Sequence, residues 1–225
     1  MNKSIIYGLG IACLVIGLNS CVKTTKRKIT NDWKIVSLEE ERKGSSVVST
    51  EEDYWKTDMT ENTVYRYSHY TLLGVDGPYT YTYETTGEVK ENKMSIKKDG
   101  TWQWTQELSY DWNGSENDTY KKDLSGTWSF VSKTKGDDFK KNERIIFNIL
   151  LNKNSTIQTQ NQQVVNDYNE EKTFLTGENT MTFTVKESKK KELQLEMEST
   201  SNYSNSWSSG VNYQSKTLKM TLKEQ

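Results

Sequence analysis

The sequence predicts an all-β protein, an antiparallel up-and-down meander of about nine or ten strands closed into a β-barrel. The composition is typical of strands and turns, because the chain contains 7 Trp, 13 Tyr and 5 Phe, which favour strands, and a single Pro, which disfavours them. Hydrophobic residues make up only 32% of the chain, so a core must come from alternating strands. Such alternating segments recur between Gly, Asp and Asn turn residues. Closure removes exposed edges, so we favour a barrel; a β-sandwich is the alternative.

Residues 1–20 have the organisation of a signal peptide. Lys3 precedes an apolar run from Ile5 to Leu18, which is shorter than the roughly 20 residues of a membrane-spanning helix. The run ends Leu18-Asn19-Ser20-Cys21, which resembles the lipobox of bacterial lipoproteins. This resemblance implies cleavage before Cys21 and lipidation of Cys21; an ordinary secretory signal is the alternative. Cys13 would be removed, so the mature chain would have no disulfide, thiolate metal site or cysteine nucleophile.

Residues 21–30 form a basic segment that we interpret as a lipidated tether. Its Lys and Arg side chains could each gain about 1 kcal/mol beside anionic headgroups, and a solvated linker is equally compatible. Lipoproteins retained in the inner membrane of well-studied Gram-negative bacteria resemble one another in carrying aspartate directly after the lipidated cysteine, so Val22 favours the outer membrane. Lipoproteins exported to the cell surface in the Bacteroidetes carry an acidic cluster there, so the basic residues of this segment favour the periplasmic face. Without residues 1–20 the chain carries 29 basic and 31 acidic residues, so no nucleic-acid partner is expected. Residues 31–225 suit one domain.

The first half of this domain contains several expected strands. Between Trp33 and Leu38 the apolar residues switch from one face of the strand to the other, which predicts a β-bulge. The polar segment 39–61 suggests a lid-like loop with a short helix, which the sequence leaves open. The remaining expected strands of this half are Thr63 to Leu72, Tyr79 to Tyr83, Val89 to Lys97 and Trp102 to Trp112, separated by turns at 74–78, at Thr86-Gly87 and at Lys98-Asp99-Gly100.

The second half continues this pattern after an Asn113-Gly114 turn. Glu143 to Leu151 is apolar on both faces, which predicts a covered central strand. Residues 152–169 are Gln/Asn-rich with weak strand character, and 200–215 is a long hairpin tip or an extension of its strands. The other expected strands are Gly126 to Phe130, Thr180 to Lys186, Glu192 to Glu198 and Lys216 to Lys223.

Four local patterns carry a resemblance to a known family. They are Asn31-Asp32-Trp33, Asp99-Gly100-Thr101, Gly126-Thr127-Trp128 and the last strand with Leu218, Met220 and Leu222. Together with the lipobox, they resemble the lipocalin-like lipoproteins of the Bacteroidetes. The resemblance spans most of 31–223 and implies an up-and-down barrel with an apolar ligand.

The sequence offers little for catalysis or metal binding, so we expect neither an enzyme nor a cofactor. A catalytic Ser-His-Asp triad would depend on His69, because it is the only histidine of the sequence. We interpret His69 as a barrel-wall residue bonded to a tyrosine. Zinc requires several His or Cys ligands. Glu84 and Glu107 could form a carboxylate pair but equally suit outward positions. The oxygen-rich loop 111–118 lacks the glycine and glutamate spacing of a calcium loop.

The aromatic faces are the remaining candidate site. They could simply pack the core, or they could bury a small apolar or sugar-like ligand with tyrosine hydroxyls as polar contacts. The expected ligand-binding residues are Trp102, Trp104, Leu108, Tyr110, Trp128, Phe130, Tyr79 and Tyr81. The alternative function is an accessory subunit of an envelope complex, with Trp55, Tyr203 and Trp207 as interface anchors.

Overall fold

The computed structural model describes residues 26–45, 52–133, 142–203 and 212–225, and these ranges are almost entirely β-strand. The strands are β1 (Asp32–Ser45), β2 (Glu52–Met59), β3 (Thr63–Gly74), β4 (Gly77–Ile96), β5 (Thr101–Asp111), β6 (Glu116–Val131), β7 (Glu143–Gln160), β8 (Gln163–Thr173), β9 (Thr180–Lys189), β10 (Glu192–Tyr203) and β11 (Asn212–Glu224).

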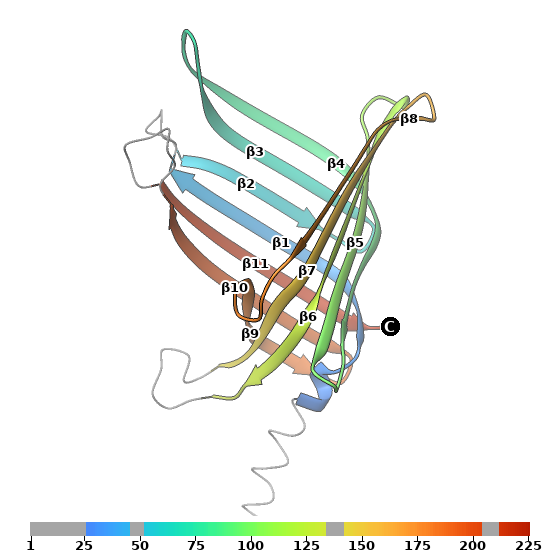
Figure 1. Cartoon of the computed structure of the whole chain (residues 1–225), viewed down its shortest axis with the longest axis vertical. Coiled ribbons are helices and arrows are strands. Elements are labelled where there is room, and N and C mark those ends of the chain that lie inside the picture. Colours follow the sequence, from blue (N-terminus) through green and yellow to red (C-terminus); the bar gives the residue numbers. More distant parts are fainter. Residues whose placement is uncertain (1–25, 46–51, 134–141, 204–211) are drawn as a thin grey trace, which may run out of the picture.

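The strands close into an antiparallel barrel (Figure 1). Neighbours in the chain pair from β1 to β7, β7 then pairs with β9, and β9, β10 and β11 lead back to β1. This ring contains ten strands, while β8 pairs with β7 outside it. The expected up-and-down β-barrel is therefore confirmed, and the β-sandwich alternative is wrong.

A short second pairing divides the barrel into a base and an open end. Asp32, Trp33 and Lys34 of β1 pair directly with β4, so the β2–β3 hairpin is bypassed at this level. The base is thus a ring of eight strands, and β2 and β3 enter only above it. Above the base, the part of β4 that precedes Glu88 is not paired with β5, and the part of β10 that follows Glu196 is not paired with β9. The upper strands consequently form two arms that diverge, one containing β1–β4, β10 and β11, the other β5–β8 (Figure 1).

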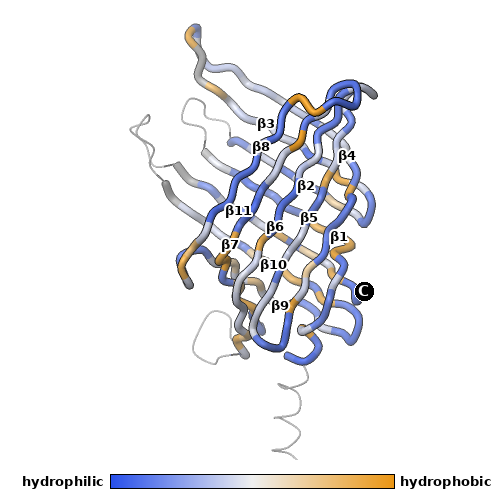
Figure 2. The backbone as a smooth tube through the Cα atoms, turned by 45° about the vertical axis from the view of Figure 1, so that its right-hand side comes forward, coloured by the Kyte–Doolittle hydropathy of each residue, from blue (hydrophilic) through white to orange (hydrophobic). Residues whose placement is uncertain are grey.

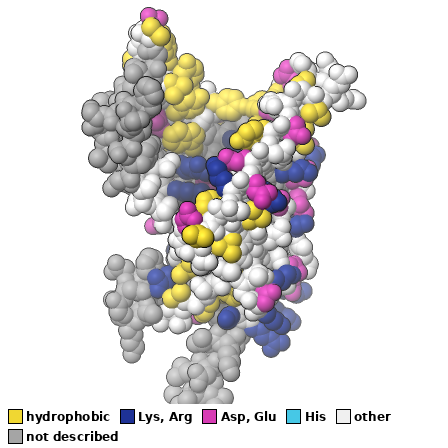
Figure 3. Space-filling model, in the orientation of Figure 1, with side chains coloured by type: hydrophobic (Ala, Val, Ile, Leu, Met, Phe, Trp, Pro, Cys, Tyr) yellow, Lys and Arg dark blue, Asp and Glu magenta, His cyan; other side chains and the backbone are white. Residues whose placement is uncertain are grey.

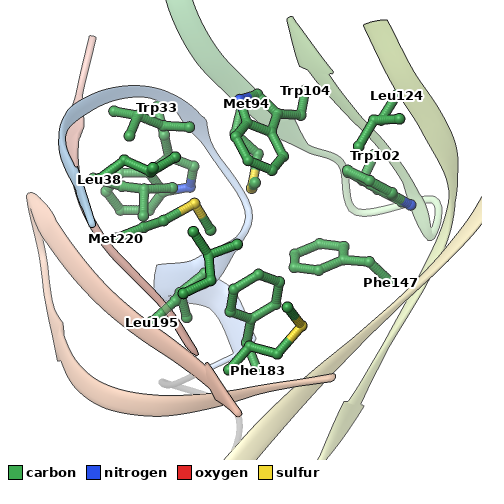
Figure 4. Close-up of a cluster of buried hydrophobic side chains, with 14 of the residues drawn as sticks. Trp33, Leu38, Met94, Trp102, Trp104, Leu124, Phe147, Phe183, Leu195 and Met220 are labelled. Carbon is green, nitrogen blue, oxygen red and sulfur yellow. The ribbon is translucent and has the colours of Figure 1, made fainter. Parts of the chain in front are cut away.

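The base encloses the hydrophobic core (Figure 4). Inward side chains from all around the ring meet there, for instance Trp102 and Phe147, whose ring centroids lie 4.6 Å apart. Phe147 in turn meets Phe183 edge-on at 5.8 Å. Alternation accounts for this packing, because every second residue of a strand faces the interior. Figure 2 shows hydrophobic stretches mainly in the lower half of the barrel and at the hairpin tips.

Residues 26–29 form a helical turn that covers the bottom of the core. Ile29 is fully buried, and its carbonyl accepts a 2.8 Å hydrogen bond from Nε1 of Trp33. Lys26 Nζ lies 5.6 Å from the ring centre of Trp128. The barrel is therefore closed at the end where the chain enters it.

Several local expectations are confirmed. The register of β1 against β11 shifts between Ile35 and Ser37, which is the predicted bulge. Gly100 and Gly114 have positive φ angles in the two predicted tight turns. The segment 200–215 extends β10 and β11, and its middle lies outside the described residues.

One expectation about secondary structure is wrong, the turn at Gly87, and two segments that the sequence left open are strands. Segment 39–61 continues β1 to Ser45 and adds β2, apart from 46–51, which lie outside the described residues. No turn occurs at Gly87, since β4 runs unbroken and the ring of Tyr110 occupies the space that a side chain there would need. The Gln/Asn-rich segment after Leu151 forms the upper part of β7 and, past a turn with positive φ at Asn161 and Gln162, β8.

We predict that Gly126→Ala destabilises the barrel strongly. A Cβ at Gly126 would lie 2.0 Å from the carbonyl oxygen of Asn148, which also accepts a hydrogen bond from Trp102 Nε1. Forcing these groups apart should lower the free energy of unfolding by about 2–3 kcal/mol, measured by denaturant unfolding. Ser129→Ala, at an exposed position of the same strand, serves as control. Equal stability of the two variants would contradict the tight approach.

Candidate binding site at the open end of the barrel

The interior changes from apolar to charged where the base meets the arms. On β1 the inward residue after Leu38 is Glu40, followed by Arg42. On β3 Arg66 follows Val64 at the next inward position. Lys122 of β6 and Lys216 of β11 occupy equivalent inward positions above Leu124 and Leu218. Four cations and one carboxylate thus form a charged layer, which consists of Glu40, Arg42, Arg66, Lys122 and Lys216.

A pocket of about 380 Å³ lies over this layer, between the two arms. We call it the mouth. Figure 3 shows Lys and Arg side chains in the hollow, below a band of hydrophobic side chains. The mouth is lined by Glu40, Arg42, Trp55, Thr57, Met59, Arg66, Gln106, Lys122 and Gln214.

Glu40 is the ion-pair partner of two of the cations. Lys216 Nζ lies 3.4 Å from Glu40 Oε1, and Arg42 also bonds this carboxylate. Burial alone would raise the pKa of Glu40, but attraction to Lys216 and Arg42 outweighs it and lowers that pKa. Glu40 is therefore ionised, and one negative charge opposes four positive ones.

The two remaining cations rest on aromatic rings instead. Arg66 lies 4.8 Å from the ring centre of Tyr110 and 5.4 Å from that of Tyr120. Lys122 lies 5.8 Å from the ring centre of Trp104. Within the described residues neither side chain has an ion pair or hydrogen bond of its own. Cation–π contacts hold these charges in place without neutralising them.

Burial and like charges disfavour protonation of both lysines in the charged layer. Burial lowers the pKa of Lys122, and the nearby positive charges of Lys216 and Arg42 lower it further, while Glu40 partly opposes this. Burial also lowers the pKa of Lys216, although Glu40 partly opposes this. The layer therefore carries excess positive charge at an energetic cost to the fold.

Aromatic rings continue upward from the charged layer. Trp55 stacks on Tyr70 with ring centroids 6.5 Å apart and an interplanar angle of 13°, and Tyr70 stacks on Tyr81 at 5.7 Å. On the other side of the mouth, Tyr110 stacks on Trp112 at 6.1 Å. The hydroxyl of Tyr110 is buried and has no hydrogen-bond partner among the described residues. Burial raises the pKa of Tyr110 to about 12, so this hydroxyl keeps its proton at neutral pH.

The structure distributes the expected ligand-binding residues over three regions. Trp104 and Tyr110 support the charged layer, and Leu108 is buried between them on the same face of β5. Trp102 and Trp128 belong to the packed base, with Phe130 partly buried against it. Tyr79 and Tyr81 lie on the projecting β3–β4 hairpin and are about half exposed. None of these eight residues lines the mouth itself; Trp104 and Tyr110 lie against its lining residues Lys122 and Arg66, and Tyr81 continues the ring stack that begins at Trp55.

Sequence reasoning missed the charged layer, although a signal was present. Lys122 lies between Tyr120 and Leu124 at one face of β6, and Arg66 lies between Val64 and Ser68 at one face of β3. A charged residue at one of the alternating positions that are otherwise apolar in a strand is a candidate for a buried or functional position. Trp55, assigned to a loop, instead lines the mouth from β2. Tyr203 is placed only as the end of β10, and Trp207 lies outside the described residues.

The other candidate chemistries lie elsewhere. His69 is on the outer side of β3, and its Nδ1 is 3.1 Å from Oγ1 of Thr82. Glu107 also faces outward and pairs with Lys121 at 3.1 Å. Glu84 is an outward residue of β4. Over the described ranges, no group of three or more His, Cys, Asp or Glu is placed to hold a metal ion, and no helix is long and apolar enough to cross a membrane.

A second hollow, of about 390 Å³, lies between the turns at the tips of β5–β6 and β7–β8. Its polar groups are largely occupied by the turns themselves. Gly114 N donates to Asp111 Oδ1 at 2.6 Å, and Asn161 N donates to the carbonyl oxygen of Ser115 at 2.7 Å. The mouth is therefore the better candidate for a binding site. Comparisons with protein-family models, curated proteins and solved structures find no match to this chain.

We predict that Lys122→Met stabilises the protein. Removing a charge that burial and Lys216 disfavour should raise the free energy of unfolding by an amount on the order of 1 kcal/mol at pH 7. The folded pKa of Lys122 lies below its unfolded value, so the wild type regains stability as the pH rises from the folded toward the unfolded pKa. The advantage of the variant should therefore shrink with rising pH.

Denaturant unfolding at several pH values would measure both effects. Lys121→Met is the matched control, because Lys121 is the outward neighbour and pairs with Glu107 at the surface. Its free energy of unfolding should change by less than about 0.5 kcal/mol. A loss of stability in Lys122→Met would contradict the assignment of Lys122 as a disfavoured charge.

Proposed function

We propose that this chain is a lipid-anchored envelope protein whose barrel binds a small ligand in the mouth. The observation that carries the proposal is the contrast between the two ends of one barrel. The base is packed with apolar side chains and closed by the turn at 26–29, whereas the other end opens into a pocket of about 380 Å³. This volume falls in the range of small-molecule sites, which are about 300–1,000 Å³.

The lining of the mouth supports binding rather than further packing. Stacked rings from Trp55 to Tyr81 offer a flat apolar surface, and they are incompletely covered by the protein. Polar groups that could fix an orientation converge below them, including Gln106 and Thr57. An aromatic wall with a few convergent polar groups is the usual arrangement of a ligand site.

The proposed location depends on the sequence before the barrel. The Leu18-Asn19-Ser20-Cys21 segment and the resemblance to lipocalin-like lipoproteins of the Bacteroidetes support lipidation of Cys21. Val22 and the basic residues that follow favour the periplasmic face of the outer membrane. In this proposal the ligand is carried or sensed at the envelope.

A second candidate function is that of an accessory subunit that docks on another envelope protein. The observation in its favour is the projecting β3–β4 hairpin, whose outer part exposes Leu72 and Val75. Exposed apolar side chains at a projecting tip are typical of an interface. The experiment below separates the two functions.

We expect native mass spectrometry of the full protein, extracted mildly from its membrane, to show a small-molecule adduct. Trp55→Ala should reduce the bound fraction, because it removes the first ring of the aromatic wall. Tyr54→Ala is the matched control, since Tyr54 lies on the outer face of the same strand beside Tyr67. A stoichiometric protein partner without a small-molecule adduct would refute the binding proposal and support the accessory subunit.

Lipidation is testable separately. A Cys21→Ala variant should lose incorporation of labelled fatty acid and should leave the membrane fraction, because the acyl chains attach to the thiol of Cys21. A Cys13→Ala variant should keep both properties, since Cys13 belongs to the segment that cleavage removes. Undiminished fatty-acid labelling of the Cys21→Ala variant would contradict the assignment of Cys21 as the lipidated residue.

A further inference from the structure

We propose that the ligand of the mouth is an organic oxyanion: a carboxylate or phosphate group bound by the charged layer, joined to a flat or apolar body that lies against the aromatic wall. This inference rests on the proposed binding function and names the chemical class of its ligand. It follows from the charge balance, the fixed positions of the cations and the arrangement of the rings.

Positive charge exceeds negative charge in the charged layer. Arg42, Arg66, Lys122 and Lys216 come from four different strands and converge on one level of the barrel, where Glu40 is the single carboxylate of the layer. Two other inward carboxylates, Asp53 and Asp118, have partners of their own. Asp53 accepts from the backbone of Thr71 at 3.0 Å, and Asp118 accepts from Tyr120 and Gln158.

The fold itself gains nothing from this excess charge. Alternation would place apolar residues at these inward positions, as it does in the base. The lysines are instead held where burial and mutual repulsion disfavour them. An anion between the cations would remove that repulsion, so its binding energy includes the relief of a cost already present in the free protein.

The cations are also preorganised for an anion. The ring faces of Tyr110 and Tyr120 hold the guanidinium of Arg66, and Trp104 holds the ammonium of Lys122. These contacts use the faces of π systems and leave the N–H donors available. Arg66 can therefore donate two hydrogen bonds to one oxyanion, which is the geometry that guanidinium groups favour.

The aromatic wall defines the body of the ligand. Trp55 lines the mouth beside Arg42, its cross-strand partner, and the stack continues through Tyr70 to Tyr81. A molecule with its oxyanion in the charged layer would extend upward along these rings. A planar ring system or an apolar chain would bury most surface there. A polar body such as a free inorganic anion would leave the wall unused.

Calorimetric titration of the full-length protein in non-ionic detergent can test this class directly. The probes are naphthalene-2-carboxylate, 2-naphthyl phosphate and the neutral 2-naphthalenemethanol, which share one ring system. We expect both anions to bind at least tenfold more tightly than the alcohol, with the preference falling as salt increases. Whichever of the two anions binds more tightly shows whether the ligand carries a carboxylate or a phosphate ester.

Variants locate the effect. Lys122→Met and, separately, Arg66→Met should reduce the preference for the anions to less than threefold while leaving binding of the alcohol largely unchanged. Lys121→Met, the outward control, should behave as the wild type. Binding of the alcohol as tightly as the anions, or an anion preference that survives both inward variants, would overturn the oxyanion inference and leave the binding function standing. Failure of all three probes to bind would count against both.

Discussion

The structure depends on the three residue pairs by which β1 meets β4 at the base. This contact closes eight strands around the apolar core and leaves β2 and β3 to enter only above it. Because a closed ring has no free edge, the base needs no further cover. The strands that leave the ring at its top can diverge without exposing the core. A packed base and an open mouth are therefore two consequences of one pairing.

The change of chemistry along the barrel axis follows the same boundary. Below it, tryptophans fill the interior and each places its indole N–H on an acceptor, as Trp104 does on Asn92 at 2.9 Å. Above it, ring faces are used to hold cations. Trp104 serves both purposes, since its nitrogen is bonded within the wall and its face lies beneath Lys122. The uppermost side chains of the packed core thus lie directly beneath the cations of the mouth and give them a rigid support.

The sequence was informative where one face of a strand is apolar and less so elsewhere. Strict alternation located β5 almost to the residue, and Asp99-Gly100 located its turn. Gly87 was misread as a turn because its role, to leave room for the ring of Tyr110, depends on a residue 23 positions away. The upper part of β7 and β8 escaped notice because both faces are polar, which removes the pattern. The charged layer was missed for a related reason: side chains from four strands form it, and sequence spacing does not show their convergence.

The turn at 26–29 has a consequence for how ligand would reach the protein. It closes the base, at the opposite end of the barrel from the mouth (Figure 1). Lys26 is five residues from Cys21, and an extended chain spans about 3.5 Å per residue. A lipid on Cys21 would therefore keep the closed end within about 20 Å of the bilayer surface and point the arms toward the aqueous compartment. Such a protein would take a ligand from solution rather than from the lipid phase beneath it, and that ligand would have to be soluble enough to arrive by diffusion through water.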